Sequence, residues 1–288
     1  MQRTASDLVE NIHSLISMPE VYLRVQQLTE SPTSSINDFA KVIQFDPALS
    51  ARILSISNSS FFGFPAKIET LDRAVNLLGI SQIHDLVLAS SAIQFFSTVE
   101  INVLNKMDFW RDSIHCAVLC RMLAQQANIL ENERLFVAGL LHQLGYLVIC
   151  LEEPQTVLRI IEKSEKDQKP RYLIEREILG FDYAQVSGAL LRKWKLPAAF
   201  HEIVEFHIEP SKGTQFPLET LILHIAQRLV EKTNQERKGI IAPLDIPPET
   251  LELLNLDEHQ LGKLKNESNQ HLIESMKLLL TRSSPVAA

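Results

Sequence analysis

The segment of this sequence with the clearest potential for chemistry is an apolar run that contains a single histidine. Residues 138–145 read AGLLHQLG, so His142 lies between two glycines. A glycine in a helix interior costs about 1 kcal/mol relative to alanine, so close packing or a ligand must compensate. An imidazole can bind a metal or transfer a proton. On an apolar helix it is also typical of a hydrogen-bonded core residue, and both interpretations stay open.

Other residues that could join His142 in a metal site are scattered along the chain. Asp112 and His115 are three positions apart, which puts them on one face of a helix. His207 and His224 follow much later in the sequence. These five side chains could converge into a site, or His115 and His224 could be ordinary helix residues at unrelated depths.

Composition argues against several classes of partner. The chain has 288 residues, and 28 Lys and Arg stand against 35 Asp and Glu, for a formal net charge of −7. An acidic chain without a basic stripe gains little from counterion release, so we expect no nucleic-acid partner. No apolar run reaches the length of about 20 residues that a membrane span needs, so we expect no membrane insertion.

The three cysteines do not indicate a disulfide framework. Cys116, Cys120 and Cys150 are an odd number of thiols in apolar segments, and such cysteines are typical of small core residues. This usage favours a reducing compartment, and we expect a cytoplasmic location.

Apolar residues recur with helical spacing along almost the whole chain, which predicts an all-α fold. The start signals are clear: Asp46 precedes Pro47, and Thr70 precedes an apolar helix at residues 71–78. Gly79 then predicts a left-handed cap at the end of that helix. Further helices are predicted at residues 81–96, 107–127, 131–151, 154–166, 170–179, 182–193, 197–207, 218–233 and 257–282.

A polar break at residues 99–106 predicts a boundary between two sets of helices. We therefore predict an N-terminal lobe of short helices at residues 1–100 and a second helical lobe at residues 101–235. Residues 236–288, which include nearly all of a proline-containing loop predicted at 235–248, are predicted to pack on the second lobe.

Several segments resemble one family of helical proteins. Residues 138–145 resemble the Leu-Leu-His-Asp-hydrophobic-Gly run of the HD-domain metal phosphohydrolases, and more of the chain is similar to the HDOD (HD-related output domain) branch of that superfamily. The matching segments are residues 46–54, 58–63 and 74–79 in the first lobe, and 109–110, 175–180 and 194–197 in the second. The resemblance covers about residues 19–207 and extends to the helix from 218, and it implies a multi-helix HD-like core lobe packed with the N-terminal lobe.

The resemblance also implies where metal ligands would lie in a catalytic relative. The first histidine position holds Asp112, the His-Asp pair is His142 and Gln143, and the distal aspartate position holds Gln227. The later histidine positions fall near Tyr183 and at Phe206 and His207. The implied vestigial pocket therefore consists of Asp112, His142, Gln143, Tyr183, Phe206, His207 and Gln227.

Gln143 and Gln227 are the decisive differences, because a neutral amide is a poor ligand for a catalytic cation. Two histidines fall short of the three protein ligands of a typical catalytic zinc site. We therefore expect no catalytic residues, no bound metal and no cofactor.

The resemblance favours a non-catalytic signal-transduction or scaffolding module, as in bacterial signalling, that binds a protein partner. The sequence names neither the partner nor the oligomeric state. Two alternatives stay open: a metal-dependent phosphohydrolase acting on a nucleotide or cyclic dinucleotide, and a sensor that binds a nucleotide without hydrolysing it.

Overall fold

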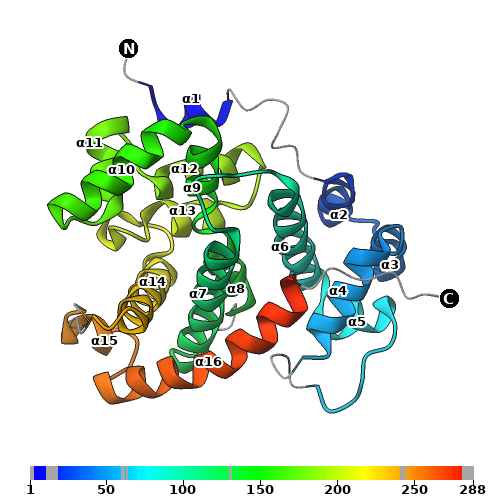
Figure 1. Ribbon diagram of the computed structural model, residues 1–288. Helices are drawn as coiled ribbons and strands as arrows, with labels where there is room; N and C mark the ends of the chain where they lie inside the picture. Colours follow the sequence, from blue (N-terminus) through cyan, green and yellow to red (C-terminus); the bar gives the residue numbers. More distant parts are fainter. Residues whose placement is uncertain are drawn as a thin grey trace. The chain divides into compact units, whose positions relative to one another are not determined.

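The computed structural model describes residues 3–10, 19–59, 62, 64–129, 132–240, 244 and 246–280. Every regular element in these ranges is a helix (Figure 1), which confirms the predicted all-α fold. The chain divides into two compact units. The first unit comprises Met1–Ser17 and Glu100–Ser268, and the second comprises Met18–Val99 and Asn269–Ala288. The three-part division proposed from the sequence stays a prediction.

The second unit is built from short helices around one longer helix. The longer helix, α6, contacts α2, α4 and α5, and α3 packs against α2, α4 and α5. Residues 83–93 of α6 are buried throughout, so this stretch of the helix has no face exposed to solvent. The bounds are α2 Glu20–Glu30, α3 Ile36–Gln44, α4 Pro47–Ser57, α5 Leu71–Leu78 and α6 Ile80–Thr98.

The predicted helix starts in this unit are confirmed. The Asp46 carboxylate accepts a hydrogen bond from the backbone amide of Leu49 at 3.0 Å, and α4 begins at Pro47. The Thr70 hydroxyl accepts from the amide of Arg73 at 3.3 Å. Both caps satisfy an amide that the first helical turn leaves without a partner.

Gly79 differs in part from its prediction. Its φ of 84° is positive as expected, but its ψ of 161° is extended rather than left-handed helical. This conformation is essentially restricted to glycine, and it turns the chain directly from α5 into α6 with one residue between them. Residues 60, 61 and 63 of the segment 58–63 lie outside the described residues.

The first unit combines two long helices, α7 and α14, with shorter ones that pack in pairs. Helix α7 packs along α8 and α14, and α12 packs against α9, α13 and α1 (Figure 1). The bounds are α1 Ala5–Glu10, α7 Lys106–Gln126, α8 Asn132–Leu141, α9 Leu144–Glu152, α10 Pro154–Asp167, α11 Arg171–Leu179, α12 Tyr183–Lys193, α13 Ala198–Phe206, the 3-10 turn η1 Pro210–Lys212, α14 Pro217–Arg237 and α15 Pro248–Glu252. Helix α16, Glu258–Leu280, belongs to the first unit up to Ser268 and to the second unit from Asn269.

The predicted single helix over 131–151 is wrong, because His142 and Gln143 form a turn between α8 and α9. The apolar spacing continues through this turn, so periodicity could not show the break. The run Glu133–Glu152 is also long and apolar enough to cross a membrane, contrary to the expectation from sequence, but 83% of its apolar window is buried inside the protein. Burial in a core accounts for its composition.

Two further boundaries differ from the sequence prediction. Helix α14 continues to Arg237 rather than ending at residue 233. The loop predicted at 235–248 is followed by the short helix α15, which begins at Pro248. Pro247 precedes α15, and Pro248 occupies its first turn, a position where the missing amide costs nothing. The prolines therefore indicate a helix start as well as a loop.

The two glycines around His142 are explained by packing. A Cβ added to Gly139 would lie 2.7 Å from the Cα of Ala117 on α7. A Cβ added to Gly145 would lie 2.2 Å from the carbonyl oxygen of Tyr183 and 2.4 Å from the amide nitrogen of Ser187. The Gly145 amide donates to the Ser187 hydroxyl at 2.7 Å. Both glycines let helix backbones approach more closely than any side chain would allow.

We predict that Gly145→Ala lowers the free energy of unfolding by about 3 kcal/mol, because the added methyl group must push two backbone segments apart. A matched control is Gly262→Ala on α16, where an added Cβ meets nothing within 4 Å. The control should raise stability by roughly 0.5–1 kcal/mol through helix propensity alone. Urea unfolding of both variants measures the difference, and equal effects would contradict the packing explanation.

Candidate functional site

His142 is held in the interior of the first unit by hydrogen bonds at both ring nitrogens. Its Nδ1 lies 2.6 Å from the carbonyl oxygen of Gly139 on α8, and its Nε2 lies 2.7 Å from the Oε1 of Gln227 on α14. The Gln143 side chain donates to the same Oε1 at 3.4 Å. The turn between α8 and α9 is therefore joined to α14 through the amide of Gln227.

The other end of the Gln227 amide fixes its orientation. Its Nε2 donates to Glu231 at 3.2 Å, so its oxygen faces His142. Both ring nitrogens of His142 then face oxygen acceptors, and the imidazolium form satisfies both. Burial by itself lowers the pKa of His142, but the neighbouring Cys116 and the hydrogen bonds to Gln227 and Gly139 outweigh it and raise the pKa.

His207 lies beside His142, and its pKa is shifted in the opposite direction. The two rings meet edge to face with centroids 5.2 Å apart. His207 Nδ1 donates to the carbonyl oxygen of Val204 at 2.6 Å, so Nε2 accepts from the Tyr183 hydroxyl at 3.1 Å. Burial, and then the charge of His142, hold the pKa of His207 well below its usual value. The lone pair that could bind a cation is already used by a phenol.

The cluster formed by His142, Gln143, Tyr183, His207 and Gln227 is closed to solvent at its centre. His142 and His207 have no exposed surface, and Tyr183 is 5% exposed. In such an interior every polar group needs a partner, because an unpaired one costs about 1–3 kcal/mol. The cluster meets this requirement with its own side chains and nearby carbonyl groups.

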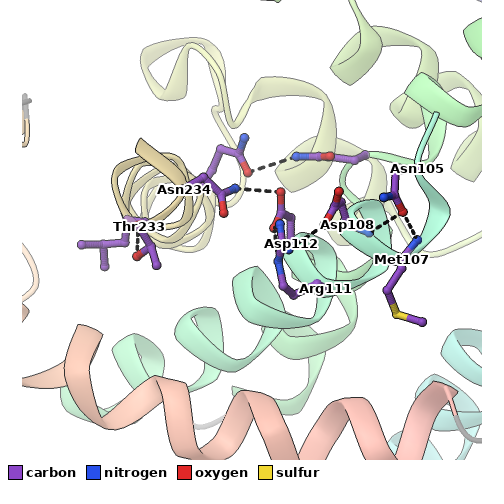
Figure 2. Close-up of polar contacts among 10 residues, drawn as sticks. Asn105, Met107, Asp108, Arg111, Asp112, Thr233 and Asn234 are labelled. Carbon is purple, nitrogen blue, oxygen red and sulfur yellow. Dashed lines mark hydrogen bonds and ion pairs between the residues drawn. The ribbon is translucent and has the colours of Figure 1, made fainter. Parts of the chain in front are cut away.

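Asp112 and Phe206, two residues of the predicted pocket, are engaged elsewhere. Asp112 accepts from Arg111 at 3.0 Å and from the Asn234 side chain at 2.7 Å, as Figure 2 shows. Burial raises its pKa, although the neighbouring Arg111 opposes the shift. Phe206 lines a separate cavity of about 240 Å3 together with Arg176. The hydrogen bonds of the His142 cluster include neither residue.

Sequence reasoning treated Cys116 as a core residue without a role at the site. It is fully buried on α7, and its thiol contacts His142. Burial raises the pKa of Cys116 well above its usual value. The antiparallel pairing of α7 and α8 implies this contact, since residues near 116 and 142 are about equally far from the connection between the helices.

The remaining histidines proposed for a rearranged site have their own partners. His115 Nε2 lies 2.8 Å from the Ser268 hydroxyl, and His224 Nδ1 donates to the carbonyl oxygen of His207 at 2.8 Å. Within the described ranges, no group of three or more His, Cys, Asp or Glu side chains is placed to hold a metal ion.

The resemblance to HD-domain phosphohydrolases implies a divalent cation, and the residues present do not fit one. The cluster offers two imidazoles whose ring nitrogens are all hydrogen-bonded, two neutral amides and a phenol. It contributes no carboxylate to offset the charge of a cation, and carboxylates are the usual hard ligands of such sites. We therefore derive no catalytic step through a metal.

These helices and this buried histidine pair define an all-helical protein of the HD-like class. The chain belongs to the HDOD family, because the HDOD domain matches residues 15–210. A relative in Treponema pallidum (strain Nichols), named "Uncharacterized protein", is 22% identical over 209 residues. The match covers 71% of this chain but spans only 40% of the length of that relative.

Solved structures of three bacterial proteins show the same fold. An HDOD domain protein of unknown function from Geobacter sulfurreducens has a TM-score of 0.75 at 18% identity, covering 96% of this chain and 99% of that one. A protein named "Putative phosphohydrolase" from Shewanella amazonensis SB2B has a TM-score of 0.72 at 23% identity, covering 96% and 97%. A "Putative signal transduction protein" from Marinobacter aquaeolei VT8 has a TM-score of 0.72 at 20% identity, covering 98% of this chain and 62% of that one. Identities this low establish the fold alone.

We predict that stability falls as the pH drops from 6.5 to 5. Burial lowers the pKa of His115 to about 4, so below pH 6.5 the unfolded chain binds a proton there that the folded chain does not. Such a group lowers the free energy of unfolding by about 1.4 kcal/mol for each pH unit between its unfolded and its folded pKa. His115→Gln should flatten the plot of unfolding free energy against pH by about this slope. Urea unfolding at several pH values tests it, with the exposed His259→Gln as the control that should leave the slope unchanged.

Proposed function

We propose that this chain is a non-catalytic signal-transduction module that acts by binding a protein partner in the cytoplasm. The observation that carries the proposal is the closed hydrogen-bond cluster at the place where a catalytic relative would need ligands. His142 Nε2 bonds to Gln227, and His207 Nε2 accepts from Tyr183. Loss of ligands removes catalysis, whereas apolar periodicity and helix caps preserve the fold.

Two further observations support this proposal. The cysteines of the described chain are all buried free thiols, which suits a reducing compartment. A protein of similar fold from Marinobacter aquaeolei VT8 is named "Putative signal transduction protein", and by analogy this name supports a signalling role. We infer no nucleic-acid partner, because the net charge is −7 and acidic proteins repel phosphate backbones.

The experiment that tests the proposal measures metal content and hydrolysis together. Protein purified without chelators or a metal-binding tag should contain Fe, Mn and Zn only at background level by plasma mass spectrometry. It should also fail to hydrolyse bis-p-nitrophenyl phosphate and cyclic dinucleotides after each metal is added. About one equivalent of bound metal, with hydrolysis lost in His142→Ala, would establish the phosphohydrolase alternative instead.

The alternative of a nucleotide sensor is tested by thermal unfolding with a panel of nucleotides. A ligand that binds only the folded state raises the unfolding temperature by mass action. We expect no shift at millimolar concentration. A saturable shift that disappears in Gln227→Leu would assign nucleotide binding to the His142 cluster and overturn a purely protein-binding role.

We predict that His142→Ala lowers the free energy of unfolding by about 2 kcal/mol, because Gln227 and the Gly139 carbonyl lose a buried partner. The same variant should still capture the protein partners that photo-crosslinking in living cells identifies for the wild-type chain. Lys263→Gln, at an exposed residue of α16, serves as the folded control. A His142→Ala protein that folds but captures none of these partners would contradict the non-catalytic interpretation.

A further inference from the structure

A second cavity lies in the first unit, between α14, α15 and α16. Its volume is about 420 Å3, and it shares no lining residue with the His142 cluster. Four of its lining residues are apolar side chains that are at most 7% exposed: Leu229, Ile246, Leu251 and Leu261. Pockets for small ligands have volumes of about 300–1,000 Å3, so the cavity has the size of a ligand site, and its lining combines these apolar side chains with charged and polar ones.

Gly262 on α16 lines this cavity and has no packing reason to be glycine. A Cβ added there would meet nothing within 4 Å, in contrast to Gly139 and Gly145. Glycine in a helix lowers its stability relative to alanine, and one recurring reason to keep it is the close approach of a ligand to the backbone. The position therefore points to an occupant of the cavity independently of the cavity's size.

The charges around the cavity indicate what kind of occupant it is. Lys265 donates to Glu236 at 2.5 Å, so its charge is offset within the protein. Lys232 is half-buried, and no carboxylate in the described parts of the chain pairs with it. Glu258 also lines the cavity but is exposed, so water can solvate it. A half-buried cation gains more from a partner than an exposed carboxylate does.

We propose that this cavity binds a single-chain amphiphilic anion of the medium-chain carboxylate class. Its alkyl chain contacts the four apolar side chains and the open backbone at Gly262, and its carboxylate pairs with the ammonium group of Lys232. The site is independent of the proposed signalling function, because it uses other residues and would exist in an enzyme as well.

The test uses purified full-length chain and a series of straight-chain carboxylates from hexanoate to dodecanoate, each kept below its aggregation concentration. Isothermal calorimetry should give affinities that rise about fourfold per added methylene group, because each buried CH2 contributes a fixed transfer free energy. The increase should stop when the chain fills the cavity. Decanol and decyltrimethylammonium, which keep the chain but change the headgroup, should bind at least about tenfold more weakly than decanoate.

Two variants locate the site, and a third controls for them. Gly262→Val narrows the cavity and should abolish decanoate binding, whereas Lys232→Gln should weaken it about tenfold. Lys263→Gln is the matched control, since Lys263 is an exposed lysine on α16 that pairs with Glu267 and does not line the cavity. Circular dichroism establishes that each variant is folded, and Gly262→Ala offers a milder substitution if valine disturbs the helix.

Each contrary result overturns a definite part of the proposal. Failure of every carboxylate to bind the wild-type chain would remove the site altogether. Equal affinity for decanoate and decanol would remove the role of Lys232 and leave an apolar cavity without anion selectivity. Decanoate binding that Gly262→Val and Gly262→Ala leave unchanged would place the ligand elsewhere on the protein. None of these results depends on whether the chain has phosphohydrolase activity.

Discussion

The interior of the first unit depends on one hydrogen bond, from His142 to Gln227. It joins the turn between α8 and α9 to α14 at 2.7 Å in a region closed to water. A buried imidazole without this partner would leave polar groups unsatisfied on two elements. The close helix contacts at Gly139 and Gly145 bring the turn into position for the bond, so the packing glycines and the polar cluster support each other.

The amides of Gln143 and Gln227 remove the need for a cation in this part of the interior. Two carboxylates buried side by side repel each other and need a cation or a proton to be tolerated. Gln143 and Gln227 carry no charge, and Gln227 supplies an acceptor toward His142 and a donor toward Glu231. The same interior positions can therefore be satisfied within the chain, and folding need not be coupled to metal binding.

Much of the helical fold could be predicted from local signals. Asp46 and Thr70 each precede a run of apolar residues with helical spacing, which predicts that they cap a helix, and both do so. The turn at His142 was missed because its cause is tertiary: helix spacing continues through it, while contacts with Tyr183 and Ser187 from a distant segment determine the backbone path. Capping residues therefore predict where a helix begins, whereas apolar spacing does not predict where an apolar helix breaks.

The candidate site was predictable to a similar extent. The resemblance to HD proteins grouped His142, Gln143, Tyr183, His207 and Gln227, and hydrogen bonds or ring contacts link these five side chains. It also included Asp112, whose partners are Arg111 and Asn234. A motif predicts which helix a residue belongs to, but it does not predict which side chains that residue contacts. Those contacts depend on how neighbouring helices pack against each other.

The near-contact of α7 and α8 at Ala117 and Gly139 has a consequence for the dynamics of the protein. With no side chain between the two backbones, neither helix can separate locally without exposing the amides of both. Local openings in proteins follow such cooperative units, and their free energies set the rates of amide hydrogen exchange. The amides around residues 117 and 139 should thus be among the slowest in the first unit to exchange, and this helix pair forms the part of the unit that opens last.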